Sequence, residues 1–142
     1  ENEPQPDCFL IVRPDHGGRT RLDDDGYFVG PPELAVEVAA STASFDLHEK
    51  REAYQQTGIG EYVIIIVHAQ QVRWLRLENG SYVDIAADAE GVYRSLMFPG
   101  LWLNSRALFS EDMKQLPRTV DQGLASPEHA QFARRLADQK TA

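Results

Sequence analysis

The chain has 142 residues, of which 42% are hydrophobic and 25% charged, and its formal net charge is −8. This length suits one domain with a real core, and the composition is that of an ordinary globular protein. The longest apolar run, Tyr62 to Val67, is too short to span a bilayer, and no signal-peptide pattern opens the sequence. We therefore expect a cytoplasmic protein without membrane contact. The single cysteine, Cys8, excludes an internal disulfide framework and a thiolate zinc site.

The charge is unevenly distributed along the chain. Residues 1 to 50 contain 11 Asp and Glu against 4 Lys and Arg, whereas residues 51 to 142 contain 11 against 10. An acidic protein lacks the cations that displace counterions from nucleic-acid phosphates, which argues against broad, sequence-independent binding. The turn-like run Asp23-Asp24-Asp25-Gly26 accounts for much of the acidic excess.

The first half of the chain predicts two strands and a helix. Residues 8 to 13 have the pattern of a strand, and residues 14 to 32 form a long polar connection. Residues 34 to 40 are apolar on both faces apart from Glu37, as in an interior strand. The period then changes to that of a helix from Asp46 to Thr57, with Asp46 and Glu49 spaced as a capping box and Gly58 as its end.

The second half predicts a central strand, a hairpin and a last helix. Tyr62 to Val67 is an unbroken β-branched run, so strand, helix and strand in succession imply a parallel crossover. Asn79-Gly80 joins the strands of a hairpin, residues 72–77 and 82–86. A further strand is expected at residues 92–97, and Ser126-Pro127-Glu128 begins a helix in the favoured order of cap, proline and acid.

Two acidic residues stand in apolar strands. Asp7 lies at the start of the first strand, and Glu37 interrupts the second. Burying a carboxylate is costly unless a cation or strong donors compensate, so the pair suggests a shared divalent ion. Asp46, Lys50 and Tyr54 recur every four residues along one side of the helix, which places Lys50 where it can point back toward the carboxylates.

This arrangement suits hydrolysis of phosphodiester bonds. Asp7 and Glu37 would ligate Mg²⁺ together with the backbone carbonyl of Val38 and several waters, because this hard ion prefers oxygen. The ion would activate a bound water, and Lys50 would stabilise the negative charge that develops on the phosphate.

The spacing of these residues resembles a known superfamily. Pro6-Asp7, then Glu37, then a lysine is similar to the PD-(D/E)XK nucleases, whose usual lysine follows two residues after the acid. Ala39 occupies that position here, but some members carry the lysine on the following helix, where Lys50 stands.

The pattern from Pro6 to about Phe109 most resembles the Uma-two family, a bacterial family of restriction-endonuclease-like proteins long labelled as a domain of unknown function. Its pattern is matched by Pro6-Asp7, by the run Gly30-Pro31-Pro32-Glu33-Leu34-Ala35-Val36-Glu37-Val38, and by Asp46, Lys50, Tyr54, Gly58, Glu61 and Tyr62.

The resemblance implies an α/β fold with a restriction-endonuclease-like mixed central sheet flanked by helices and a C-terminal hairpin extension. It implies residues 1–110 as this domain and residues 111–142 as a polar linker and helix. Family members begin with further helix and strand elements before the Pro-Asp strand, so we expect these N-terminal elements to be missing here. The implied activity is that of a Mg²⁺-dependent endonuclease acting on nucleic acid, with DNA as the expected substrate. The implied catalytic residues are Asp7, Glu37 and Lys50.

Other interpretations remain open for each residue. Asp7 can be a turn residue at a strand start, Glu37 can form a buried ion pair with Lys50, and Asp46 suits a helix cap better than a ligand. The rival function is a catalytically weak binding or scaffolding module on the same fold. Such a module can be a homo-oligomer through the last helix, whose apolar positions are Phe132, Leu136 and Ala137.

Overall fold

The computed structural model describes residues 5–42 and 45–140, and the side chains of Phe45 and Asp46 lie outside that description. The helix-cap role predicted for Asp46 therefore falls outside the described residues. The chain forms two compact units, Glu1–Ile85 and Ala86–Ala142. The division into residues 1–110 and 111–142 stays a prediction. In the described ranges, no helix is long and apolar enough to cross a membrane.

The first unit is built on a mixed sheet. Within the described residues its five strands follow the order β1-β4-β5-β6-β7. They are β1 (Cys8–Leu10), β4 (Leu34–Ala39), β5 (Glu61–Ile66), β6 (Gln71–Glu78) and β7 (Ser81–Ile85). Only β4 and β5 pair in parallel, and the other pairs are antiparallel. The predicted central position of the β-branched run and the predicted parallel crossover are both confirmed.

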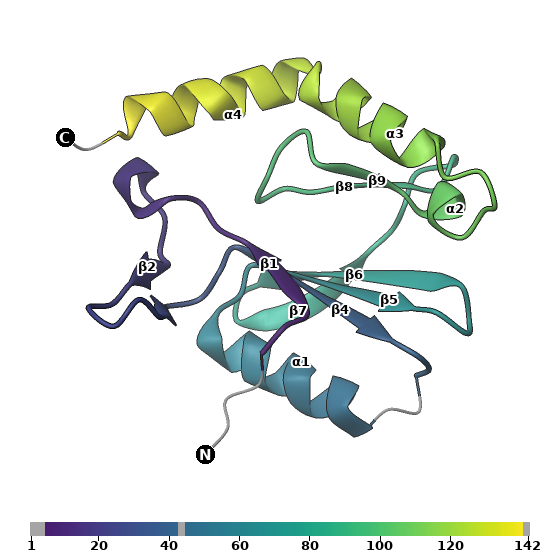
Figure 1. Cartoon of the computed structure of the whole chain (residues 1–142), viewed down its shortest axis with the longest axis horizontal. Coiled ribbons are helices and arrows are strands. Elements are labelled where there is room, and N and C mark those ends of the chain that lie inside the picture. The colour runs from purple at the N-terminus through teal and green to yellow at the C-terminus, as the bar shows by residue number, and fades with distance from the viewer. Residues whose placement is uncertain (1–4, 43–44, 141–142) are drawn as a thin grey trace. The chain divides into compact units, whose positions relative to one another are not determined.

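Helix α1 (Phe45–Thr57) connects the two parallel strands and lies along one face of the sheet (Figure 1). It ends as predicted at Gly58, which has a φ of 88° and donates its N–H to the carbonyl of Tyr54. Glycine suits this position because residues with a side chain are strained at positive φ. The sharp end returns the chain to the start of β5.

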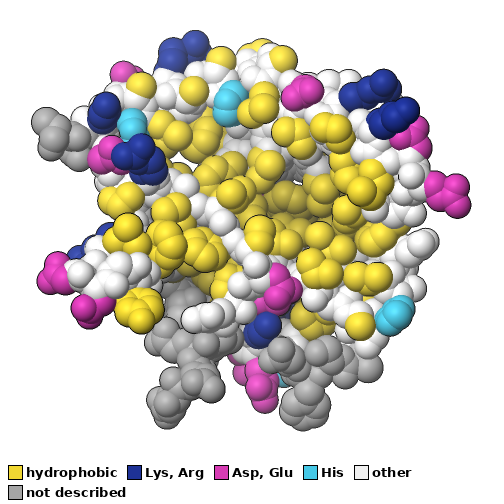
Figure 2. All heavy atoms as spheres, viewed as in Figure 1, with side chains coloured by type: hydrophobic (Ala, Val, Ile, Leu, Met, Phe, Trp, Pro, Cys, Tyr) yellow, Lys and Arg dark blue, Asp and Glu magenta, His cyan; other side chains and the backbone are white. Residues whose placement is uncertain are grey.

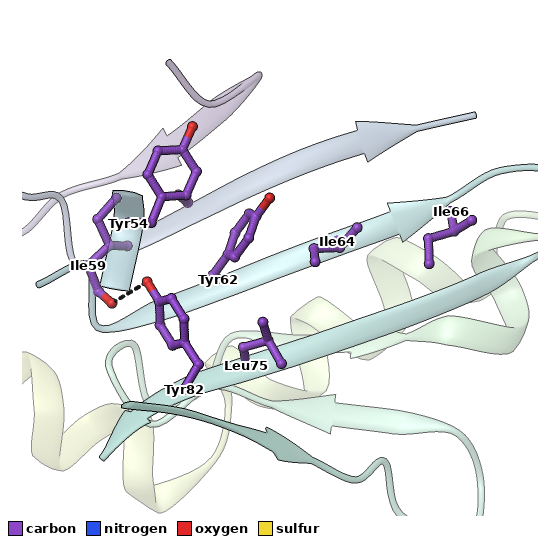
Figure 3. Packing of buried hydrophobic residues seen from close by; sticks show 8 residues of the cluster. Tyr54, Ile59, Tyr62, Ile64, Ile66, Leu75 and Tyr82 are labelled. Atoms are coloured by element: carbon purple, nitrogen blue, oxygen red, sulfur yellow. Dashed lines mark hydrogen bonds between the residues drawn. The ribbon is translucent and has the colours of Figure 1, made fainter. Parts of the chain in front are cut away.

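The core of the first unit lies between α1 and the sheet (Figure 3). Tyr54 of α1 packs edge-on against Tyr62 of β5, with ring centroids 5.0 Å apart. The hydroxyl of Tyr82 is buried among these side chains and donates to the carbonyl of Ile59 at 2.8 Å. The buried cluster consists of Ala35, Tyr54, Ile59, Tyr62, Ile64, Ile66, Leu75 and Tyr82.

The predicted hairpin is formed by β6 and β7. Asn79 and Gly80 have φ angles of 52° and 83°, the left-handed conformations that a tight hairpin turn requires at both central positions. The register pairs Glu78 with Ser81 directly across this turn. The Asn-Gly sequence therefore determined both the turn and the pairing.

The polar connection of residues 14–32 contains structure that the sequence did not predict. It holds a short 3-10 helix, η1 (Pro14–His16), and a small ribbon of β2 (Arg21–Leu22) and β3 (Phe28–Val29). Strands of two residues are too short to show a period of two. The predicted strand 8–13 ends early, because the Val12 N–H bonds to the Glu33 carboxylate instead of a strand.

The second unit combines a small sheet with helices. Strands β8 (Val92–Arg94) and β9 (Trp102–Asn104) pair antiparallel and are followed by α2 (Ser105–Leu108), α3 (Gln115–Leu124) and α4 (Pro127–Asp138). The predicted start of α4 is confirmed, since the Ser126 hydroxyl accepts the His129 N–H at 3.3 Å. Helix α3 was not predicted, because Pro117 and Gly123 lower the helical propensity of its sequence.

Two glycines allow α3 to lie against the turn before β9. A Cβ at Gly123 would lie 2.0 Å from the carbonyl oxygen of Gly100, and one at Gly100 would lie 2.6 Å from the Cβ of His129. Gly100 also has a φ of 99°, which disfavours residues with a side chain. Both positions therefore need glycine for the backbones to approach this closely.

Candidate active site

Glu37 is a buried carboxylate on the face of β4 that α1 covers. Glu37 is only 3% exposed to solvent. Its Oε1 accepts the Tyr54 hydroxyl at 2.9 Å, and its Oε2 lies 3.1 Å from Nζ of Lys50. Because α1 follows β4 directly and runs back over it, side chains four residues apart on the helix reach the same carboxylate.

Lys50 comes back toward Glu37, as the helical spacing predicted. Its side chain is 16% exposed, so the ion pair with Glu37 is largely shielded from water. The buried ion pair that stood as the alternative for Glu37 is therefore present. A catalytic lysine beside its acid in a nuclease would form the same ion pair. The catalytic roles of Glu37 and Lys50 therefore stay predictions.

Asp7 is exposed and lies immediately before β1. Its Oδ2 accepts the backbone N–H of Val38 at 2.7 Å. The antiparallel register of β1 and β4 begins at Cys8, which pairs with Val36, so Asp7 lies just before the paired residues. Its carboxylate reaches the edge of β4 at the peptide N–H that follows Glu37, and its negative charge acts on the Glu37 carboxylate.

The charges of the site act on one another. Burial raises the pKa of Glu37 above 4.5, the hydrogen bonds from Lys50 and Tyr54 and the charge of Lys50 lower it, and the negative charge of Asp7 raises it. The net shift is upward. The effect of burial on the pKa of Glu37 therefore exceeds that of the hydrogen bonds from Lys50 and Tyr54. A second cation beside the carboxylate would offset the rest of the cost of burying its charge.

The donor set fits a hard divalent cation. The ligands predicted from the sequence, namely the Asp7 and Glu37 carboxylates and the Val38 carbonyl, are all oxygen donors, which Mg²⁺ prefers. Each Glu37 oxygen accepts one protein hydrogen bond, and a carboxylate oxygen has a second lone pair for a metal. In the described ranges, no three His, Cys, Asp or Glu side chains converge as a metal cluster.

The backbone of Val38, and not its side chain, lies at the candidate site. Its side chain is 54% exposed and projects from the other face of β4, because neighbouring side chains of a strand alternate. Its N–H binds Asp7, which ties the start of β1 to the residue after Glu37. The carbonyl predicted as a ligand belongs to the next peptide along the same strand.

Two further buried acids were given no defined role by the sequence. Glu33 is 4% exposed, and its carboxylate accepts the N–H groups of Val12 at 2.8 Å and Arg19 at 3.3 Å. Glu61 is fully buried and accepts the indole N–H of Trp74. The signal for Glu33 was its place between the Pro31-Pro32 pair and an apolar strand, where a solvated carboxylate is not expected.

Five strands in a mixed sheet, with a helix between the parallel pair and an acid and a lysine at that crossover, define a restriction-endonuclease-like fold. Residues 1–106 match the Uma2 family model, described as "Putative restriction endonuclease". The chain belongs to the Uma2 family. Helices α3 and α4 lie beyond the matched residues. Comparison with curated proteins gave no match.

Proposed function

We propose that this protein is a Mg²⁺-dependent nuclease that hydrolyses phosphodiester bonds in DNA. The observation that carries the proposal is the buried Glu37 carboxylate, which is bound by Lys50 and is followed by the Val38 N–H that the Asp7 carboxylate accepts. Restriction-endonuclease-like proteins generally use a divalent metal, and the family assignment supports that chemistry. The cytoplasmic location stays a prediction.

Each residue has a separate role in this proposal. Asp7 and Glu37 would hold Mg²⁺ together with the carbonyl of Val38. When bound, the ion supplies Lewis acidity and lowers the pKa of a water ligand. Lys50 donates to a non-bridging phosphate oxygen, because its ammonium has three N–H donors and can be shared between carboxylate and phosphate. Tyr54 orients the Glu37 carboxylate through its hydroxyl.

Two observations favour the rival function of a catalytically weak scaffold. Both oxygens of Glu37 already accept hydrogen bonds from the protein itself, so the pair with Lys50 is stable without a ligand. The net charge of −8 points the same way, since it opposes attraction to nucleic acid. A scaffold would keep the buried pair for its structure alone.

The test is cleavage of supercoiled plasmid, single-stranded DNA and RNA in MgCl₂ and in EDTA. We expect DNA cleavage that EDTA stops and that Glu37→Gln lowers by at least about 100-fold. The matched control is Asp84→Asn, which neutralises an exposed acid paired with Arg73 on β6 and leaves the site intact. Equal activity in the parent and Glu37→Gln would sink the assignment, and no cleavage by any variant would favour the scaffold.

A further inference from the structure

The Glu37 carboxylate is held by two donors from one helix. Its Oε1 accepts the Tyr54 hydroxyl at 2.9 Å, and its Oε2 lies 3.1 Å from Nζ of Lys50. The two donors are four residues apart on α1 and so share one side of the helix. Tyr54 is 2% exposed, whereas the side chain of Lys50 is 16% exposed. Lys50 is therefore the donor that solvent reaches more easily.

The two donors differ in their response to a cation at the carboxylate. The Tyr54 hydroxyl is neutral, so it can stay hydrogen-bonded to a carboxylate oxygen whose second lone pair binds a metal. The ammonium of Lys50 is charged, and it repels any cation that binds the same carboxylate within a few ångströms. Lys50 and a metal ion would therefore compete for Glu37, whereas Tyr54 would not.

Asp7 adds a second negative charge to this pair. Its carboxylate accepts the Val38 N–H beside Glu37, and its charge acts on the Glu37 carboxylate. In the ranges that the structure describes, Asp7 enters no ion pair of its own. Figure 2 shows acidic and basic side chains at the surface in the region where Figure 1 draws the start of β1 and helix α1. The single charge of Lys50 thus leaves these two carboxylates with a net negative charge.

We infer that Lys50 is an internal competitor of the metal at Glu37 and that a divalent cation releases it from the carboxylate. The inference rests on the proposed function and deepens it, because the release makes the ammonium available to the phosphate. A divalent cation competes well since it gains the charge of Asp7 as well as that of Glu37. A monovalent ion gains less and leaves the ion pair in place. Lys50 therefore sets which cations the site accepts.

Acetylation of lysines in the whole chain tests the release of Lys50. The other two lysines, Lys114 and Lys140, are exposed and serve as controls within the same sample. MgCl₂ should speed acetylation of Lys50 several-fold, measured by mass spectrometry, because the released side chain is no longer shielded by its ion pair. NaCl at equal ionic strength should not have this effect, and neither salt should change the rates at the control lysines.

Calorimetric titration with Mg²⁺ measures the competition without DNA. Lys50→Met removes the competing charge, so its Mg²⁺ affinity should exceed that of the parent at least about tenfold. Arg51→Met removes the neighbouring cation of α1, which takes no part in the contacts of Glu37, and should change the affinity much less. Because Lys50→Met is less stable, circular dichroism checks that it is folded. The acetylation of the parent tests the inference even where this variant does not fold.

The outcomes distinguish this inference from the proposed function. A parent that binds Mg²⁺ without faster acetylation of Lys50, or a folded Lys50→Met with no gain in affinity, would overturn the inference. DNA cleavage that EDTA stops can accompany that result, and the proposed function then survives alone. Conversely, release of Lys50 by MgCl₂ without DNA cleavage supports the inference and contradicts the nuclease. Absence of Mg²⁺ binding in both the parent and Lys50→Met overturns both.

Discussion

The hydroxyl of Tyr54 donates a hydrogen bond of 2.9 Å to Oε1 of Glu37, and both side chains are buried. Hydrogen bonds to a charged group contribute about 1.5–3 kcal/mol. We expect Tyr54→Phe to lower the free energy of unfolding by about 2 kcal/mol, measured by urea denaturation. Tyr27→Phe removes the same hydroxyl from a side chain that is 72% exposed and should change little.

Lys50 should be needed for stability as well as for activity. Removing one partner of a buried ion pair leaves an uncompensated charge and costs about 3–5 kcal/mol. We expect Lys50→Met to destabilise the protein by about 3 kcal/mol in the same assay. Lys50→Met in the background of Glu37→Gln should cost much less, because no buried charge is left unpaired. Equal costs in both backgrounds would mean that the pair does not act as a unit.

Substitution of Asp7 can show whether this acid is a metal ligand or only a hydrogen-bond acceptor for the backbone. Asp7→Asn keeps a side-chain oxygen that can accept the Val38 N–H but removes the negative charge. We expect it to leave the unfolding free energy nearly unchanged while lowering Mg²⁺ affinity at least about tenfold by calorimetric titration. Asp7→Ala should lower both. Unchanged Mg²⁺ affinity in Asp7→Asn would show that the acid is only a backbone acceptor.

Glu37 should make stability depend on pH in a defined direction. Burial raises the pKa of Glu37 above 4.5, so the folded protein holds this proton more tightly than the unfolded chain does. The stabilising contribution of the group is then full below pH 4.5 and is lost as the pH rises through the folded pKa. We therefore compare the unfolding free energies of the parent and of Glu37→Gln, measured by urea titration at several pH values. The parent's value minus that of the variant should fall as the pH rises from 4.5 through the folded pKa of Glu37. A difference that grows with pH would contradict a raised pKa.

Glu33 should control the loop between β1 and β2. Its carboxylate accepts the N–H groups of Val12 and Arg19 at the two ends of that loop. Glu33→Ala leaves both donors without this partner, so we expect trypsin to cleave after Arg13 or Arg19 several times faster. Mass spectrometry of the early fragments identifies the sites. Glu78→Ala removes an exposed acid and should leave the cleavage rate unchanged.

The sequence predicted the elements that carry a strong periodic or turn signal. The β-branched run became β5, the Asn79-Gly80 turn became a hairpin, and helix α1 ended at Gly58. The contact of Lys50 with Glu37 was predictable for the same reason, since helical spacing fixes which side chains share a side.

The missed features depend on contacts between distant parts of the chain. The β2–β3 ribbon is held by Phe9 and by side-chain bonds at its ends, and no period reveals strands of two residues. Helix α3 forms because Gly123 lets it approach Gly100, although glycine lowers helical propensity. The acceptor of the Tyr54 hydroxyl, the Glu37 carboxylate, was likewise not predicted.

The close approach at Gly100 and Gly123 restricts how this chain can vary. A methyl group at Gly123 would meet backbone, and backbone cannot rotate away as a side chain can. A second substitution of a nearby side chain cannot make room for this methyl group, because it meets the backbone of Gly100. Both glycines are therefore needed for the same close contact. A saturation library selected for folded protein should therefore show these sites nearly empty of variants, while exposed positions of α4 beside them accept most residues.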